Sequence, residues 1–341
     1  MMGDMKRGKV KKMLFLLGLS LVTLYLVGGV IGAIVVPNAI LGHRGSDNSG
    51  LRYRIYKNKE DYPSLSNGQG IDFLSDGNTL RGHLYQASAS KGVVLYAHGM
   101  NSSCLGPECL LQDYFVTQGY DVFAFDLTAH GDSEGTKMGD FYQSVRDMKS
   151  AYETLQKQGR LHDESILCGY SWGGFAAAMC AKDLLPDRLV TFSAFDDPYE
   201  LMLSSAVRTV GPIAYATVPP FALGTLLSGG TTSFAKASES IPVKTKVFAF
   251  QGKNDGTVSL DTSFARHMEG KGTTYYNDAK HFFPWLDSSA GEYVATLEPS
   301  FLELENKPKE ERENFLSTID KNKSSARDAA LFESLTEFLS K

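Results

Sequence analysis

The sequence predicts an α/β fold with a doubly wound, mostly parallel sheet, preceded by one transmembrane helix. Apolar runs of strand character alternate with segments of helical spacing along most of the 341-residue chain, which is typical of such a sheet with right-handed crossovers. Between one such run and an Ala-rich helical segment, residues 169–174 read Gly-Tyr-Ser-Trp-Gly-Gly. Near the start of the chain, residues 13–36 carry no charge and are long enough to cross a bilayer.

The N-terminal segment predicts a signal anchor. Residues 1–12 carry five basic side chains and one acidic one, a net +4, which leaves −9 for the rest of a chain whose net charge is −5. Basic residues before an apolar span favour a cytoplasmic N-terminus, so we expect a single-pass protein of the cell membrane with an extracytoplasmic domain. The alternative is a cleaved signal peptide and a secreted domain, although residues 36–39 form a poor cleavage site. The acidic remainder has no basic patch and argues against a nucleic-acid partner.

Residues 37–67 are polar and weakly patterned, and we interpret them as a juxtamembrane linker before a domain at 68–341. The domain opens with a hairpin of residues 71–74 and 80–85, whose turn is Asp76-Gly77-Asn78. Further strands are expected at residues 92–97, 120–126, 165–168, 189–195, 244–251 and 273–276. Helices are expected at residues 107–118, 141–158, 175–182 and 326–339.

Two segments interrupt this alternation. Residues 197–240 separate two strands by more than a crossover needs and are rich in small and apolar side chains. Residues 302–324 are highly charged, and we expect a solvated surface insertion.

The hexapeptide at residues 169–174 predicts a nucleophile. A strand, a sharp turn and a helix with serine at the apex expose the hydroxyl of Ser171, and the glycines avoid collisions with neighbouring backbone. The start of the following helix offers N–H groups and a positive dipole to a developing oxyanion. The alternative is a turn whose small residues only pack the helix on the strand.

Acyl transfer by serine needs a base and an acid that orients the base. After the serine, Asp255 follows the strand at 244–251, and His281 follows the last strand. For the acid, Asp196 and Asp197 compete, because they follow another strand; otherwise that pair lies in a solvated loop. The remaining histidines either precede the serine or lie away from this edge of the sheet: His43, His83, His98, His130, His162 and His267.

The four cysteines do not define a metal site. Cys168 and Cys180 flank the hexapeptide, and we expect them to be buried and inert. Cys104 and Cys109 could pair in an oxidising compartment, but four cysteines allow three full pairings and the sequence does not choose among them. The spacing lacks companion ligands for zinc, so neither a metal nor a cofactor is predicted.

Five motifs together resemble one superfamily: His98-Gly99 after a strand, Asp126-x3-His130-Gly131-Asp132-Ser133-Glu134-Gly135, the hexapeptide, Gly252-x2-Asp255-x2-Val258 and the last-strand histidine. Residues 68–341 resemble the α/β-hydrolase superfamily, in its esterase, monoglyceride-lipase and serine-aminopeptidase-like group. The resemblance implies an oxyanion hole of the backbone N–H groups of Met100 and Trp172. It also implies that 197–240 is a lid, and that His130 and Asp132 are structural. The anchor and the charged insertion depart from most members.

We therefore expect a membrane-anchored serine hydrolase, a carboxylesterase or lipase-like enzyme that forms an acyl-enzyme. A serine peptidase, a thioesterase or acyltransferase of the same fold, and a catalytically silent binding or scaffold protein at the membrane are the alternatives. In the lid, Phe221 and Leu223 are predicted to contact an apolar acyl chain, so that the substrate is a small, lipid-derived ester; otherwise these residues only pack on the sheet. The sequence does not identify the acyl group or the oligomeric state.

Overall fold

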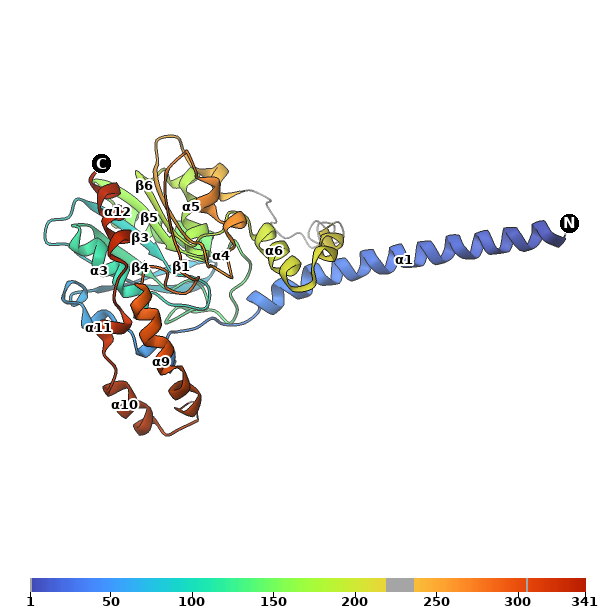
Figure 1. Ribbon diagram of the computed structural model, residues 1–341. Coiled ribbons are helices and arrows are strands. Elements are labelled where there is room, and N and C mark those ends of the chain that lie inside the picture. Colours follow the sequence, from blue (N-terminus) through green and yellow to red (C-terminus); the bar gives the residue numbers. More distant parts are fainter. Residues whose placement is uncertain (1, 219–235, 305) are drawn as a thin grey trace. The chain divides into compact units, whose positions relative to one another are not determined.

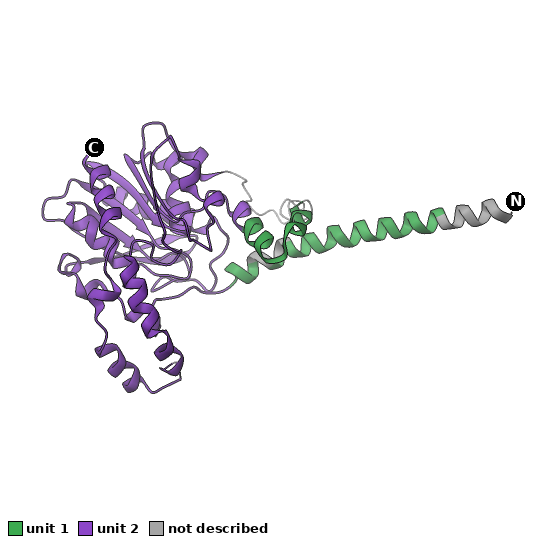
Figure 2. Cartoon of the chain, viewed as in Figure 1, with its two compact units in different colours: residues 1–42, 202–234 green, residues 43–201, 235–341 purple. Residues whose placement is uncertain are grey.

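The computed structural model describes residues 2–218, 236–304 and 306–341. The chain divides into two compact units, residues 1–42 with 202–234 and residues 43–201 with 235–341 (Figure 2). The first unit contains helix α1 (Met2–Leu41), most of α6 (Pro198–Val210) and the 3₁₀ turn η4 (Pro212–Thr217). Within α1, Lys11–Gly32 is a stretch of 22 residues that is long and apolar enough to cross a membrane.

The second unit is built on an eight-stranded sheet in the order β1-β2-β4-β3-β5-β6-β7-β8. Strand β2 pairs antiparallel with both of its neighbours, and every later pairing is parallel. The mostly parallel sheet predicted from the sequence is therefore confirmed. The strands are β1 (Gln69–Ser75), β2 (Asn78–Tyr85), β3 (Gly92–Ala97), β4 (Asp121–Phe125), β5 (Glu164–Tyr170), β6 (Arg188–Phe192), β7 (Lys246–Gly252) and β8 (Thr273–Asn277).

Helices cover both faces of this sheet, and every residue of β3, β4 and β6 is buried (Figure 1). Alternate strand residues such as Tyr96 and Phe248 pack in one core cluster with α3 (Cys109–Thr117) and α12 (Ala329–Ser340). The helices α4 (Gln143–Lys157) and α5 (Trp172–Leu184) cover the other face. Burial on both faces explains why these strands are continuous apolar runs in the sequence.

The element boundaries differ from the predictions at two turns. The hairpin turn has two residues, because Ser75 pairs with Asn78 and both Asp76 (φ 47°) and Gly77 (φ 82°) adopt positive φ. Strand β6 ends at Phe192 instead of residue 195, because Ser193 also has a positive φ of 47°. The remaining short elements are η3 (Gly106–Glu108), η5 (Ala237–Ser240), η6 (Leu260–Thr262) and α8 (Phe264–His267).

The structure also differs from the predicted linker at 37–67. Residues 43–67 belong to the second unit, where they form α2 (Leu51–Arg54), η1 (Lys59–Asp61) and η2 (Pro63–Leu65). Ile55 (0% exposed) and Leu65 (2%) are core residues. Because these short turns bury single side chains and not one face of a long helix, the segment has no periodic apolar pattern. The unit therefore begins at residue 43 and not at 68.

The charged insertion forms part of a larger helical segment. The helices α9 (Ser288–Leu304), α10 (Lys309–Ser317) and α11 (Lys321–Ser324) follow the last strand. The segment 51–61 is ion-paired to all three of these helices, through Arg52–Glu298 (2.8 Å), Arg54–Glu313 (2.7 Å) and Lys321–Asp61 (2.7 Å).

Candidate active site

Ser171 lies at a strained turn between β5 and α5, with φ 51° and ψ −111°. Its N–H donates to the carbonyl of Phe192 on the neighbouring strand (2.8 Å), which fixes the turn to the sheet. A Cβ on Gly173 would collide with the carbonyl of Ala97, and one on Gly169 would collide with the backbone of Gly173. The hexapeptide thus needs glycine at both positions, and this close packing is the geometry of a nucleophile elbow.

The structure brings together the three side chains that the sequence predicted as a triad. The hydroxyl of Ser171 is 3.0 Å from Nε2 of His281. The other ring nitrogen of His281, Nδ1, is 2.7 Å from Oδ2 of Asp255. Because a carboxylate only accepts hydrogen bonds, Nδ1 donates to Asp255 and leaves Nε2 as the acceptor for the serine proton.

The carboxylate of Asp255 is held from several sides. Its Oδ1 accepts the N–H groups of Thr257 and Val258 (2.8 Å each). Its Oδ2 accepts the side-chain amide of Gln251 (3.1 Å) as well as the ring of His281. Four donors therefore fix the orientation of this carboxylate, and through it the orientation of the imidazole.

The backbone of His281 is also fixed, because the hydroxyl of Tyr170 donates to its carbonyl at 2.8 Å. Sequence reasoning did not identify Tyr170, which stands within the hexapeptide, directly before the serine. The ring centroids of Tyr170 and His281 lie 5.5 Å apart. The nucleophile elbow and the loop of the base thus support one another directly.

The competing acids lie in another polar cluster. Asp196 accepts the N–H (2.7 Å) and hydroxyl (3.0 Å) of Ser238, and its side chain lies 3.6 Å from His267. The interpretation of Asp196 and Asp197 as a solvated loop is wrong, since they are only 0% and 4% exposed. Burial raises the pKa of both carboxyl groups. The prediction failed because a pair of aspartates looks solvent-exposed when its serine partner is 42 residues away in the sequence.

The predicted oxyanion donors come from the start of a helix and from a turn: Trp172 directly follows Ser171, and Met100 directly follows Gly99, on which a Cβ would lie 3.4 Å from that of Ser171. Trp172 is the first residue of α5, so its N–H has no acceptor inside the helix. Met100 is the second residue of a turn closed by the N–H of Ser102 and the carbonyl of Gly99 (3.2 Å). In this turn Asn101 has a φ of 56°. Both N–H groups are therefore placed by backbone that the motif residues constrain.

Two buried histidines beside this turn are neutral. The Nδ1 of His130 lies 3.0 Å from the carbonyl of Thr128, so it carries the proton, and Nε2 accepts the N–H of Asn101 (3.2 Å). His98 has the same tautomer, since its Nδ1 contacts the carbonyl of Gly99 (2.7 Å) and its Nε2 accepts the N–H of Leu127 (3.0 Å). Burial lowers the pKa of His98 to about 4 and that of His130 to about 3.

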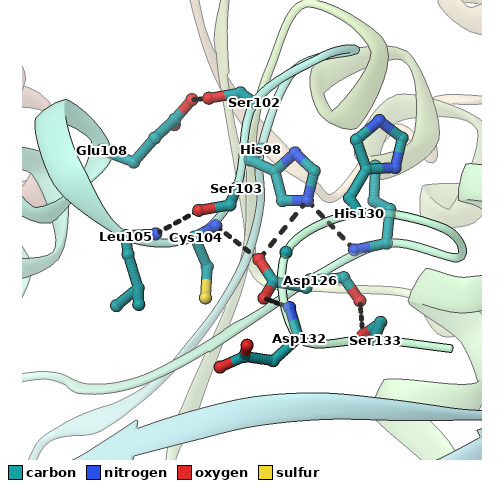
Figure 3. A network of polar contacts seen from close by, with 12 residues as sticks. His98, Ser102, Ser103, Cys104, Leu105, Glu108, Asp126, His130, Asp132 and Ser133 are labelled. Carbon is teal, nitrogen blue, oxygen red and sulfur yellow. Dashed lines mark hydrogen bonds and ion pairs between the residues drawn. The ribbon is translucent and has the colours of Figure 1, made fainter. Parts of the chain in front are cut away.

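The loop after β4 is organised by Asp126 (Figure 3). Its carboxylate accepts the N–H groups of Cys104 (2.7 Å) and Asp132 (2.9 Å), and its carbonyl accepts the hydroxyl of Ser133 (2.6 Å). A Cβ on Gly131 would collide with the same carboxylate. The motif at residues 126–135 therefore joins two loops at the carboxyl edge of the sheet, and its side chains lie outside the contacts of Ser171 and His281.

Glu108, which the sequence did not single out, lies buried beneath the turn that contains Met100. Its carboxyl group contacts the hydroxyl of Tyr96 and accepts that of Ser102 (2.8 Å). Burial raises the pKa of Glu108 to about 8. A single glutamate at the start of an apolar helix gives no periodic signal, so only the folded structure reveals its contacts with Tyr96 and Ser102.

The structure describes only some of the remaining predicted residues. All four cysteines are free and buried. Phe221 and Leu223 lie outside the described residues, and so does most of the second half of the predicted lid at 197–240. The function of that segment as a lid stays a prediction. Within the described part of the chain, no group of three or more His, Cys, Asp or Glu residues is arranged to hold a metal ion.

Comparisons of the sequence with known proteins find similarity over part of the chain. Residues 88–240 match the family model described as Hydrolase_4, serine aminopeptidase, S33. The chain is 29% identical over 132 residues to a multifunctional-autoprocessing repeats-in-toxin of Vibrio vulnificus, and 30% identical over 125 residues to that of Vibrio cholerae. Those matches cover 35% and 33% of this chain but only 2% and 3% of the toxins.

Among solved structures, an esterase from Pyrococcus furiosus is similar in fold. The match has a TM-score of 0.50 and 20% identity, and it covers 69% of this chain and 90% of the esterase. At this identity the likeness concerns the fold. Together with the eight-stranded sheet and the elbow, it shows that the chain has the α/β-hydrolase fold and that, over residues 88–240, its sequence is similar to serine hydrolases.

Proposed function

We propose that this chain is a membrane-anchored serine hydrolase that cleaves carboxylic esters through an acyl-enzyme. The observation that carries the proposal is the continuous chain of contacts from Ser171 through His281 to Asp255, at 3.0 Å and 2.7 Å. The three groups come from three different loops at one edge of the sheet, and their order along the chain is that of the fold's hydrolases. A packing role alone does not require these three hydrogen-bonding groups to be aligned.

The reaction follows from this geometry. His281 Nε2 takes the proton of Ser171 while Oγ attacks the ester carbonyl, and Asp255 stabilises the imidazolium that forms. The N–H groups of Met100 and Trp172 receive the oxyanion. His281 then gives its proton to the leaving alcohol, which leaves an acyl-serine. A water molecule then attacks the acyl group while His281 Nε2 takes its proton. The imidazolium returns this proton to Oγ as the acyl–oxygen bond breaks, which releases the acid and restores Ser171 and the neutral base.

The anchor and the substrate class belong to the same proposal. Lys11–Gly32 is apolar enough to hold the enzyme at a membrane, which would keep it close to lipid-derived esters. The predicted acyl contacts of Phe221 and Leu223 add an apolar wall, in which each buried methylene contributes about 0.8 kcal/mol. If so, p-nitrophenyl esters should be cleaved with rising kcat/KM as the acyl chain lengthens from acetate toward octanoate.

A serine peptidase is the second candidate, and the serine aminopeptidase description of the family that matches residues 88–240 favours it. The same triad attacks amides, so the geometry of Ser171 does not separate the two. Aminoacyl p-nitroanilides compared with p-nitrophenyl esters at equal concentration distinguish them. Faster turnover of the anilides would replace the esterase proposal by the peptidase.

A fluorophosphonate probe tests the nucleophile itself. The wild type should become covalently labelled, Ser171→Ala should not, and His281→Ala should label far more slowly, because the serine then lacks its base. Equal labelling of the three proteins would contradict the assignment. A wild type that neither takes the label nor cleaves any ester or anilide would favour the silent binding protein instead.

A further inference from the structure

The turn Gly99–Ser102, named here the oxyanion turn, is held by several hydrogen bonds. The N–H of Asn101 donates to His130 (3.2 Å), and its carbonyl accepts the hydroxyl of Tyr53 (3.4 Å). The hydroxyl of Ser102 donates to Glu108 (2.8 Å). Among the hydrogen bonds of the described residues, none occupies the N–H of Met100. A turn that aims one donor at a developing charge must be rigid, and the other contacts supply that rigidity.

Part of this support comes from a segment that the sequence did not connect with the site. Residues 43–53, named here the strap, begin two residues after α1 ends at Leu41. The strap exchanges backbone hydrogen bonds with the loop after β4, from Gly45 N to Ala129 O (2.8 Å) and from Gly131 N to Ser46 O (3.1 Å). The strap is therefore fixed in register with the loop that carries His130.

Arg44 strengthens this attachment. Its guanidinium donates to the carbonyls of Gly131 (2.5 Å), Ser133 (2.8 Å) and Gly135 (2.9 Å). With the carbonyl of His130 at 3.5 Å, four carbonyls converge on one cation, which suits the fixed fork of donors on arginine. These hydrogen bonds attach the strap to the loop of residues 131–135.

Asn48, which also belongs to the strap, contacts the oxyanion turn through its side chain. Its amide nitrogen contacts the hydroxyl of Ser102 (3.3 Å) and the carbonyl of Leu105 (3.0 Å), and its side-chain oxygen has no hydrogen-bond partner among the described residues. Since a carbonyl only accepts, the NH₂ group must face the turn. Asn48 is 7% exposed and has a φ of 56°. The backbone is thus bent into a rarely populated conformation that directs this one amide inward.

We propose that the strap positions the oxyanion hole, and that Asn48 is the positioning residue that holds Ser102 and thereby the direction of the Met100 N–H. Asn48 does not touch the substrate; it acts through the turn. The proposal deepens the serine-hydrolase function and rests on it. It also sets an N-terminal limit for activity. Cleavage near residues 39–40 leaves the strap intact, whereas a chain that begins after Asn48 lacks the contact.

The test uses the full chain in detergent. Asn48→Gly removes the amide while glycine accepts the positive φ without strain. Because loss of a whole oxyanion donor costs about 10²–10³-fold in kcat, a misdirected donor should cost about tenfold or more, with KM for p-nitrophenyl butyrate changed less than about twofold. Thr245→Val is the matched control, since Thr245 donates a buried hydrogen bond to the carbonyl of Pro186 (2.8 Å) just before β7. It should retain the wild-type kcat.

A second variant separates hydrogen bonding from shape. Asn48→Asp keeps the size of the side chain and its tolerance of positive φ, but it sets a carboxylate oxygen against the carbonyl of Leu105. If Asn48 acts as a donor, Asn48→Asp loses at least as much kcat as Asn48→Gly. Recovery of wild-type kcat by Asn48→Asp would show that only the shape matters and would overturn the proposal.

Hydrogen exchange measures the turn without activity. Peptides covering residues 99–105 should exchange at least about tenfold faster in Asn48→Gly than in the wild type, and at the wild-type rate in Thr245→Val. Unchanged exchange, or an unchanged kcat in Asn48→Gly, would overturn the proposal. A wild type that is inert toward esters and the fluorophosphonate would instead refute the proposed function, which separates the two failures.

Discussion

At the scale of single residues, two buried carboxylates differ clearly in their hydrogen-bond partners. Asp255 accepts hydrogen bonds from His281 and from three further donors, whereas Asp196 lies with Ser238. Sequence order alone left both as candidates for the acid. Only the fold decides, because the loop after β7 meets the loop after β8 across neighbouring parallel strands.

Asp255→Asn should therefore reduce kcat by about 10⁴-fold, because an amide stabilises the wrong tautomer of the imidazole and cannot stabilise its charged form. The measurement is steady-state hydrolysis of p-nitrophenyl butyrate. Asp196→Asn is the matched control and should stay within a few-fold of the wild type. A larger loss in Asp196→Asn than in Asp255→Asn would reverse the assignment.

Three buried groups predict how stability depends on pH. The pKa values of His98 (about 4) and His130 (about 3) lie below the ordinary value of 6.5, so the unfolded chain binds more protons and stability falls as the pH falls below 6.5. The pKa of Glu108 is raised from 4.5 to about 8, so its contribution is complete below pH 4.5 and is lost as the pH rises toward 8. From these groups, stability should be greatest near pH 6.5.

The variant Glu108→Gln tests the part of this pH dependence that lies above pH 6.5. Each group contributes a slope of up to about 1.4 kcal/mol per pH unit while its protonation differs between the folded and unfolded chains. Urea unfolding between pH 6.5 and 8 should show a falling free energy of unfolding in the wild type and a flatter curve in Glu108→Gln. The same slope in both proteins would show that Glu108 is ionised in the folded chain.

At the scale of elements, the nucleophile elbow depends on close backbone contact. Gly173→Ala places a Cβ against the carbonyl of Ala97 and should lower the free energy of unfolding by about 1–3 kcal/mol or more. Gly291→Ala is the matched change in α9, where a Cβ meets nothing within 4 Å. It should stabilise the chain by about 0.5–1 kcal/mol, because alanine favours the helix. Chemical denaturation of both variants checks the pair, and a neutral Gly173→Ala would contradict the close packing.

The same elements show which parts of the fold and of the candidate site could be predicted from the sequence. The buried parallel strands and the order of Ser171, Asp255 and His281 were predictable, because continuous apolar runs and motif spacing report them directly. The strap was not, because its contacts join single residues such as Asn48 and Arg44 to loops that are far away in the sequence. Nor was the C-terminal end of β6, which depends on one positive φ at Ser193.

At the scale of the whole molecule, the proposal of a signal anchor makes a topological prediction. With the basic residues 1–12 in the cytoplasm, the domain lies outside. Protease added to intact cells should then degrade the domain, while a tag placed before residue 1 stays protected until the cells are lysed. Protection of the domain in intact cells would reverse the orientation, and a mature protein that begins near residue 39 would show cleavage.

The four cysteine thiols are free and buried, so the rates at which they are chemically modified can report local opening of the structure. Burial raises the pKa of all four, so the reactive thiolate is scarce in the native state. A disulfide reagent in the solvent should consume them no faster than the surrounding structure opens. Cys104 and Cys109 lie beside the oxyanion turn, whereas Cys168 and Cys180 lie on β5 and α5. Their rates of modification, resolved by peptide, would therefore report whether the loop region opens before the centre of the sheet does.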